Sequence, residues 1–88
     1  MAWRIEFEAA ALKELEQLDY KVQKDIWRFL RERLATDQDP RRFGDPLRKN
    51  LFRLWKYRVG AYRLVCDIQG ERLVVLVVRL GHRREVYR

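Results

Sequence analysis

The sequence predicts an α+β domain in which two helices pack on one face of a single small sheet. Three observations predict this class: an alternating stretch near the start of the chain, two stretches of helical periodicity behind it, and a second half in which one strand pattern follows another. The 88 residues, of which 48% are hydrophobic, are enough for one core. We therefore expect residues 1–88 to form a single domain.

The first half of the chain predicts a strand followed by a helical hairpin. The opening "AWRIEFE" alternates apolar and charged side chains, as a half-buried strand does. Residues 9–18 and 20–36 then carry apolar residues at helical spacing. Asp19 lies between the two stretches and is a candidate N-cap. Trp27 lies off the centre of the second apolar stripe, where it either closes the edge of the core, the safer interpretation, or faces a partner.

The second half predicts a loop and then strands. Both prolines and one glycine fall within residues 37–50, which is typical of a surface loop. The stretches "LFRLWKYRV" and "AYRLVCDI" then flank Gly60, "RLVVLVVRL" follows the turn "QGE", and together they predict a three-strand antiparallel meander. The last strand is apolar on both faces and should lie centrally in the sheet. Cys66 is expected to be a small core residue rather than a nucleophile.

The net charge of +7 is concentrated in the second half of the chain. Residues 1–36 carry seven basic and seven acidic residues, whereas residues 37–88 carry thirteen basic and six acidic ones. From Arg41 to Arg63, eight basic residues face a single acidic one, Asp45. A charge run is often only a solvated face, but this asymmetry favours a polyanion or an acidic protein partner.

Composition also narrows the cellular setting and the chemistry. No apolar run approaches the ~20 residues of a membrane span, and the start of the chain lacks the apolar region of a signal peptide, so a cytoplasmic protein without a membrane partner is expected. With one histidine and one cysteine, no metal site is expected. No glycine-rich phosphate loop occurs, and no cofactor is expected.

Basic residues gather around the predicted strands. Alternation places Lys56 and Arg58 on one strand face, and the turn at Gly60 brings Arg63 close to them. Arg83 and Tyr87 follow the end of the last strand. Such a group can bind a phosphate and stack a base, but basic residues on a sheet can equally discourage aggregation, and the pattern alone leaves these interpretations even.

Four stretches that span nearly all 88 residues point to one family. They are the opening "WRIEF" with the "KEL" and "LD" behind it, "DPRRFGDPLRKNL", "LWKYRVGAYRLVCDI" and "VVRLGHRREVYR". In this order the chain resembles the RelE/ParE superfamily of toxins from bacterial type II toxin–antitoxin systems. The resemblance implies a small, largely antiparallel sheet with an N-terminal helical hairpin, in agreement with the periodicity.

The superfamily divides by function. RelE-like toxins cut messenger RNA in the ribosomal A site, whereas ParE-like toxins poison DNA gyrase and are not nucleases. The RelE-like branch uses a basic strand, an arginine after the following turn, an arginine after the last strand and a tyrosine near the C-terminus. The residues that match this pattern are Lys56, Arg58, Arg63, Arg83 and Tyr87. The resemblance therefore implies an mRNA interferase, a metal-independent endoribonuclease that needs the ribosome.

The same resemblance implies a role for each residue. Lys56 is the expected base, Arg63 stabilises the phosphate, Arg83 binds the scissile phosphate and assists the leaving group, and Tyr87 orients or stacks the nucleotide. Further RNA contacts are expected from Arg53, Arg58, His82 and Arg84.

The expected partners follow from the family as well. They are the ribosome with its mRNA and a cognate antitoxin, acidic and RelB-like; operator DNA is expected to be reached only through the antitoxin complex. Two alternatives stay open. One is a ParE-like gyrase inhibitor without nuclease activity, and the other is an RNA-binding or inactive relative that keeps the basic surface.

Overall fold

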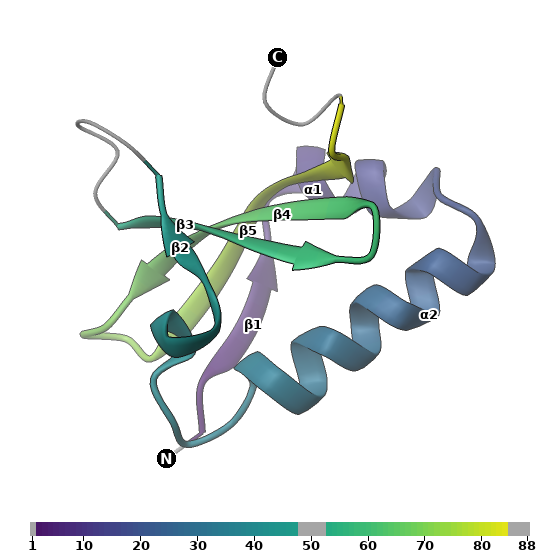
Figure 1. Ribbon diagram of the computed structural model, residues 1–88. Coiled ribbons are helices and arrows are strands. Elements are labelled where there is room, and N and C mark those ends of the chain that lie inside the picture. Colours follow the sequence, from purple (N-terminus) through teal and green to yellow (C-terminus); the bar gives the residue numbers. More distant parts are fainter. Residues whose placement is uncertain (1, 48–52, 85–88) are drawn as a thin grey trace.

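The computed structural model describes residues 2–47 and 53–84, which form a five-stranded sheet with both helices on the same side of it (Figure 1). The elements follow in the order β1 (Arg4–Phe7), α1 (Ala9–Glu16), α2 (Tyr20–Phe29), β2 (Asp45–Pro46), β3 (Leu54–Val59), β4 (Tyr62–Gln69) and β5 (Val74–His82). A π-helical turn (Leu30–Leu34) extends α2, and a 3-10 turn (Pro40–Phe43) precedes β2. The predicted α+β class is confirmed. No helix in these two ranges is long and apolar enough to cross a membrane.

The sheet has the strand order β1-β5-β4-β3-β2. Strands β3, β4 and β5 form the predicted antiparallel meander, and β1 pairs in parallel with β5. Because β5 lies between β1 and β4, the prediction of a central last strand is confirmed. The plain surface loop predicted for residues 37–50 was wrong for part of that segment, since Pro40–Phe43 is a 3-10 turn and Asp45–Pro46 pairs with β3.

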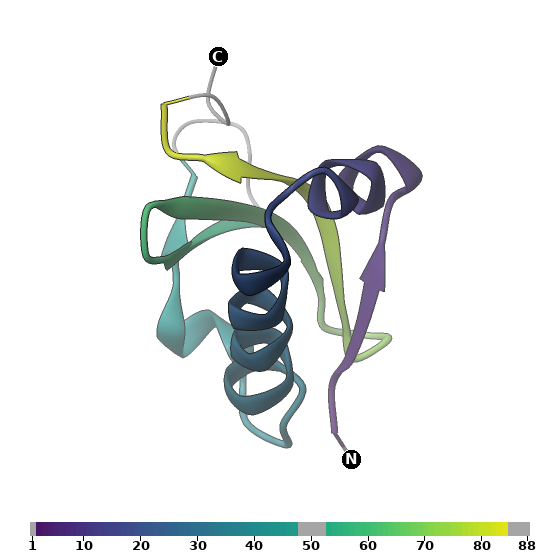
Figure 2. The same cartoon turned by 90° about the vertical axis from the view of Figure 1, so that its right-hand side faces the viewer.

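The two helices cover one face of the sheet, as Figure 2 shows from the side. Helix α1 buries Ala11 and Leu15, and α2 buries Ile26 before its π-helical turn buries two leucines more. Asp19 stands at the N-cap of α2, as predicted, but its side chain makes no capping hydrogen bond. The corner is held instead by the Gln23 amide, which donates to the carbonyl of Leu18 at 2.9 Å.

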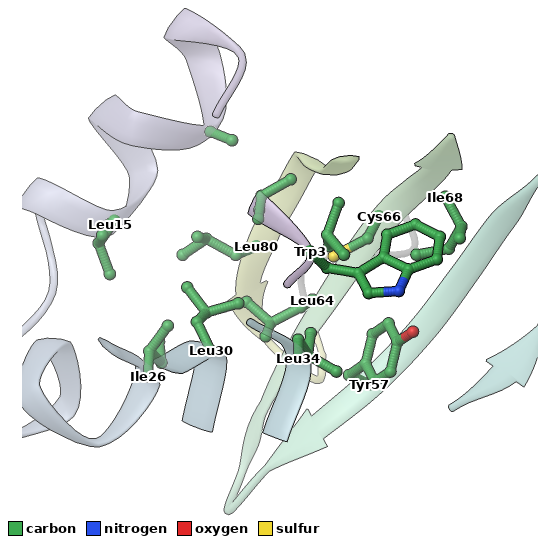
Figure 3. Close-up of a cluster of buried hydrophobic side chains, with 13 residues drawn as sticks. Trp3, Leu15, Ile26, Leu30, Leu34, Tyr57, Leu64, Cys66, Ile68 and Leu80 are labelled. Carbon is green, nitrogen blue, oxygen red and sulfur yellow. The ribbon is translucent and has the colours of Figure 1, made fainter. Parts of the chain in front are cut away.

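The core lies between the helices and the inner face of the sheet (Figure 3). Its largest fully buried side chains come from both layers: Leu15, Ile26, Leu30, Leu34, Tyr57, Leu64, Ile68 and Leu80. Cys66 is also fully buried among them. Burial raises the pKa of its thiol, with a smaller contribution from the neighbouring Asp67 carboxylate. The thiol therefore stays protonated, and the prediction that Cys66 is a core residue is confirmed.

Beyond the end of β1, helix α1 contacts the edge of β5. The last residue of β1 is level with Val77, so beyond that point the outer edge of β5 has no strand partner among the described residues. The Glu14 carboxylate accepts the backbone N–H of Leu80 at 2.9 Å and lies 3.5 Å from the Arg79 guanidinium. A side chain thus satisfies a donor that a longer β1 would have used, and α1 is tied to the end of β5 that leads to Arg83.

Candidate functional site

An open pocket of about 460 Å³ lies where β2, β3 and β4 meet. We call it the basic groove. Its lining residues are Phe43, Asp45, Lys56, Tyr57, Arg58 and Arg63. Alternation along β3 and β4 produces this arrangement, because the buried Tyr57 and Leu64 point into the core and their neighbours Lys56, Arg58 and Arg63 point away from it. The predicted grouping of these three cations on one sheet face is therefore observed.

The three cations of the groove have no ion-pair partner in the part of the chain that the structure describes. Within residues 2–47 and 53–84, none of Lys56, Arg58 and Arg63 forms an ion pair with a carboxylate. Arg58 lies directly opposite Arg63 across the β3–β4 ladder, where like charges are unfavourable. The acidic residue of the lining, Asp45, is the register partner of Lys56. The arrangement favours a bound anion, which would relieve the repulsion.

Relief of that repulsion gives a stability prediction. Arg58→Thr should raise the free energy of unfolding by about 0.2–1 kcal/mol, because it removes a like-charge pair and threonine suits a strand. Urea denaturation at low salt measures this, and the gain should shrink at high salt as the charges are screened. Arg58→Lys keeps the charge and serves as the control. Equal stability of Arg58→Thr and the parent would show that the pair carries no repulsion.

Arg63 is held in place before any ligand arrives. Its Nη1 donates to the carbonyls of Gly60 and Tyr62, both at 3.2 Å. Gly60 has a φ of 60°, so glycine suits the turn that presents its carbonyl. Because both bonds use Nη1, the donors on Nε and Nη2 remain for a ligand in the groove. A fixed, partly occupied guanidinium of this kind is suited to electrostatic stabilisation of a phosphate.

The end of β5 brings Arg83 to the same end of the sheet. The backbone N–H of Arg83 donates to the carbonyl of Ala61 at 2.8 Å, in the turn that joins β3 to β4. Arg83 is exposed, and so is Arg84. Tyr87 lies outside the described residues, and its role stays a prediction.

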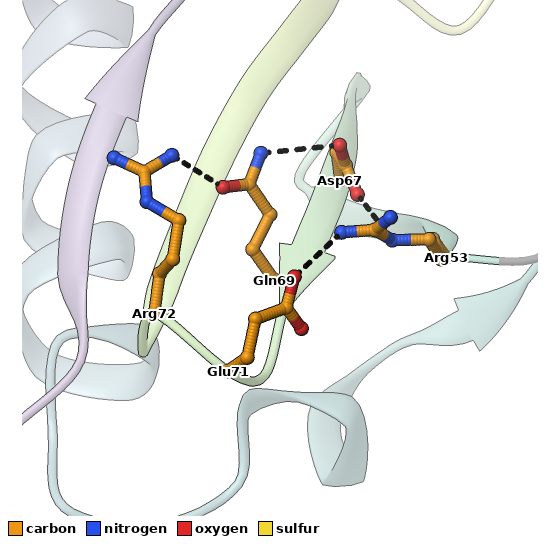
Figure 4. Close-up of polar contacts among 5 residues, drawn as sticks. All are labelled: Arg53, Asp67, Gln69, Glu71 and Arg72. Carbon is orange, nitrogen blue, oxygen red and sulfur yellow. Dashed lines mark hydrogen bonds and ion pairs between the residues drawn. The ribbon is translucent and has the colours of Figure 1, made fainter.

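Two of the predicted RNA contacts lie elsewhere. His82 pairs with Tyr62 across the ladder, packs edge-on against its ring at 5.7 Å, and so shares the face opposite to Arg63. Its Nδ1 accepts the N–H of Arg84 at 3.2 Å. Arg53 lies at the other end of β3, outside the groove lining. It pairs there with Asp67 at 3.6 Å and Glu71 at 3.2 Å, within the polar network of Figure 4. Neither residue is brought into the basic groove.

The wall of the groove beside β3 is a tightly fixed turn that the sequence did not reveal. Asp39 caps it by accepting the N–H of Arg41 at 3.0 Å, and the Tyr57 hydroxyl donates to the carbonyl of Pro40 at 2.8 Å. Burial is the main cause that raises the pKa of Tyr57, followed by the nearby Cys66 and Asp39, while Arg41 opposes them. Tyr57 therefore stays neutral and holds the turn through its hydroxyl group. The signal for this wall was the pair of Asp-Pro steps around "RRFG", which bound a short turn.

Gly44 allows this wall to touch β3. A Cβ at Gly44 would lie 2.7 Å from Cε1 of Tyr57 and 2.9 Å from the carbonyl oxygen of Lys56. Gly44→Ala should therefore destabilise the protein by about 1–3 kcal/mol, as overpacking does, measured by urea denaturation. In Gly70→Ala the nearest atom is the flexible end of Arg41 at 3.3 Å, so this control should lose less. A Gly44→Ala variant as stable as the parent would mean that the wall is loosely packed.

Metal ligands do not gather in the part of the chain that the structure describes. No three of its His, Cys, Asp and Glu side chains lie close enough together to hold an ion. The ionisable side chains that line the groove are those of Asp45, Lys56, Tyr57, Arg58 and Arg63.

Comparison with known proteins identifies the family. The model of the family described as "ParE toxin of type II toxin-antitoxin system, parDE" matches residues 5–87. Toxin RelG of Mycobacterium tuberculosis is 31% identical over 88 residues, which cover 100% of this chain and 99% of RelG. The chain belongs to the RelE/ParE superfamily of toxins from type II toxin–antitoxin systems. The family predicted from the sequence is confirmed.

Solved structures agree with this toxin's fold. A chain of the toxin–antitoxin complex RelBE2 from M. tuberculosis superimposes with a TM-score of 0.84 at 28% identity, covering 97% of this chain and 95% of that one. The isolated RelE toxin of E. coli gives a TM-score of 0.75 at 30% identity, with 98% and 92% covered. By sequence and fold the toxin is RelE-like.

Proposed function

We propose that this toxin is a ribosome-dependent endoribonuclease that cleaves messenger RNA in the A site. The observation that supports this most is the basic groove, where three cations lie on one sheet face near Arg83 and pair with no carboxylate of residues 2–47 or 53–84. A single-stranded polyanion is the ligand that such a groove favours. A substrate held by the ribosome places the proposed activity in the cytoplasm.

The proposed reaction is an internal phosphoryl transfer. The ribose 2′-oxygen attacks the adjacent phosphorus while the bond from phosphorus to the 5′-oxygen breaks, which leaves a 2′,3′-cyclic phosphate and a 5′-hydroxyl. Lys56 takes the proton of the 2′-hydroxyl. Arg63, assisted by Arg58, stabilises the charge that develops on the non-bridging oxygens. Arg83 binds the scissile phosphate from the other side and, directly or through a water, supplies a proton to the 5′-oxygen, and Tyr87 orients the nucleotide.

The alternative is inhibition of DNA gyrase. It is kept because the family model that matches the chain is the one described for ParE toxins. The two functions predict different products. An RNase shortens transcripts and leaves DNA supercoiling intact, whereas a gyrase poison leaves transcripts intact and prevents supercoiling.

One experiment separates them. The purified toxin is incubated with ribosomes programmed with a reporter mRNA, and in parallel with gyrase and a relaxed plasmid. Primer extension should show new 5′ ends inside the translated region, while gyrase supercoils the plasmid at its normal rate. An intact transcript together with lost supercoiling would replace our proposal with the alternative; if neither changes, the toxin is an inactive or purely RNA-binding relative.

The proposal includes an antitoxin partner. Similar chains were solved in RelBE complexes from M. tuberculosis and E. coli. The exposed face of α2 in this toxin combines aromatic and basic side chains: Tyr20 is 75% and Trp27 41% exposed, and Lys24 lies 5.4 Å from the centre of the Tyr20 ring. Trp27 also packs on Phe7 at 5.2 Å, so it closes the core edge and faces outward at once. An acidic, RelB-like segment with apolar residues complements this face.

Trp27→Ala tests this contact. A large aromatic side chain in the centre of an interface is worth about 2 kcal/mol or more, so the affinity for the cognate antitoxin should fall roughly 30-fold from a nanomolar value. Titration calorimetry on the co-purified pair measures it, with Lys13→Ala on α1 as the charge-changing control. Unchanged affinity in Trp27→Ala would move the antitoxin to another face.

A further inference from the structure

Phe43 forms an aromatic end to the basic groove, and two arginines lie against it. The ring is 38% exposed and lines the groove together with Lys56. The guanidinium carbon of Arg42 lies 4.8 Å from the ring centre, and that of Arg33 lies 5.6 Å from it. Among the described residues, neither arginine is paired with a carboxylate. An exposed ring with two cations at its faces therefore continues the charge of the groove beyond β3.

The position of this ring relative to Lys56 is fixed. Phe43 is the last residue of the capped 3-10 turn that the Tyr57 hydroxyl holds through the Pro40 carbonyl. The next residue, Gly44, packs against the Lys56 carbonyl and the Tyr57 ring, and Asp45 then pairs with Lys56 in the ladder. A ligand that meets the ring and the groove together therefore finds both already in place, which lowers the entropy lost on binding.

We propose that Phe43, Arg42 and Arg33 form a nucleotide subsite for a residue of the RNA chain that flanks the cleaved phosphate. The base stacks on the Phe43 ring, and the guanidiniums beside the ring bind the phosphate of that nucleotide. The proposal rests on the proposed RNA substrate. Rings and arginines are the surfaces on which single-stranded nucleic acids stack, with little dependence on sequence. An acidic peptide would also pair with the arginines, but this ring lines the same groove as the three cations proposed to hold the RNA phosphates, which favours a nucleotide.

The subsite makes no contact with the reacting atoms, so it should affect binding and leave the chemical step alone. Loss of one stacked base weakens single-strand binding roughly 5- to 150-fold. Phe43→Leu keeps an apolar side chain of similar size but removes the aromatic face, and Phe43→Tyr restores it. Arg42→Gln should lower the salt dependence of binding by about one phosphate contact.

The probe is a fluorescein-labelled, fully 2′-O-methylated single-stranded RNA, which cannot undergo 2′-hydroxyl attack. Fluorescence anisotropy gives its Kd for the full chain, and circular dichroism confirms that each variant is folded. Phe43→Leu should weaken binding within the stated range, Phe43→Tyr should bind within about two-fold of the parent, and Lys13→Ala should match the parent apart from a small charge effect. If Phe43→Leu binds as tightly as the parent, the subsite does not exist.

A scan of abasic positions locates the base. Removal of the one base that stacks should weaken parent binding as much as Phe43→Leu does, and the two changes together should give no further loss. If removal of a base weakens binding to Phe43→Leu as much as it weakens binding to the parent at every position, no base stacks on this ring, and the proposal is wrong.

The outcome is distinguishable from failure of the proposed function. A parent toxin that binds the probe through Phe43 but does not cleave on programmed ribosomes keeps the subsite and loses the nuclease. A parent that cleaves, with KM unchanged in Phe43→Leu, keeps the nuclease and loses the subsite. A parent that neither binds the probe nor cleaves loses both. If Phe43→Leu loses antitoxin affinity while RNA binding holds, the ring belongs to the protein interface and the subsite is wrong.

Discussion

Arg63→Ala should slow single-turnover cleavage on programmed ribosomes by about 10²- to 10³-fold, equivalent to roughly 2.7–4 kcal/mol of transition-state stabilisation. The reason is the fixed guanidinium, which two carbonyls hold through Nη1 so that Nε and Nη2 can meet developing charge without rearrangement. Arg83→Ala should lose a similar amount. The measurement is a quench time course at saturating toxin.

Binding controls separate this effect from simple charge. Lys13→Ala removes one positive charge from an exposed position on α1, far in sequence from the groove, and should cleave at the parent rate. The ribosome affinity of Arg63→Ala should fall only by the contribution of about one phosphate contact. If Arg63→Ala and Lys13→Ala lose the same small amount, the groove is only a polyanion-binding face and the catalytic assignment fails.

Lys56→Arg should slow the chemical step by about 10²- to 10⁴-fold while ribosome affinity holds, because it keeps the charge but cannot accept a proton in the neutral range. Single-turnover cleavage rates and ribosome binding, measured for the parent and the variant, test both parts of this expectation.

The opposite result has a structural meaning as well. If Lys56→Arg cleaves at the parent rate, Lys56 is a phosphate contact. Asp45 then becomes the residue to test, because it is the register partner of Lys56 in the ladder and lines the same groove. Asp45→Asn keeps the size of the side chain and removes its basicity. Under our assignment to Lys56, that variant should cleave at least as fast as the parent, since it removes a negative charge from the path of the phosphate.

The parts that the sequence predicted well depend on local geometry. Alternation along β3 and a short turn at Gly60 suffice to put Lys56, Arg58 and Arg63 on one face, whatever the rest of the fold does. Likewise, a strand that is apolar on both faces can be stable only inside a sheet, which placed β5 correctly. The periodicity predicted where these residues lie but not what they do, and their functions were assigned from the family resemblance.

The parts that the sequence did not predict depend on tertiary partners. In the sequence, Arg53 looks like one more cation of a basic run. In the structure it forms ion pairs with Asp67 near the end of β4 and with Glu71 in the turn beyond β4. The Pro- and Gly-rich segment reads as a loop until the buried Tyr57 hydroxyl is seen to hold it through Pro40. Phe43 and Asp45 were therefore not recognised as groove residues, because nothing local to them shows which strand they lie against.

The place of β5 has a consequence for synthesis of the toxin. In the described sheet, β1 has β5 as its strand neighbour, and β4 needs β5 on one side, yet β5 is translated after both. A growing chain thus carries an unpaired first strand and an open sheet edge until its last strand has been made, and a contact of such long sequence separation closes late. Arg83, at the end of β5, reaches the turn before Arg63 only at that final step. In a protein proposed to attack translating ribosomes, the contact between β5 and the turn before Arg63 thus forms only after β5 itself has been made.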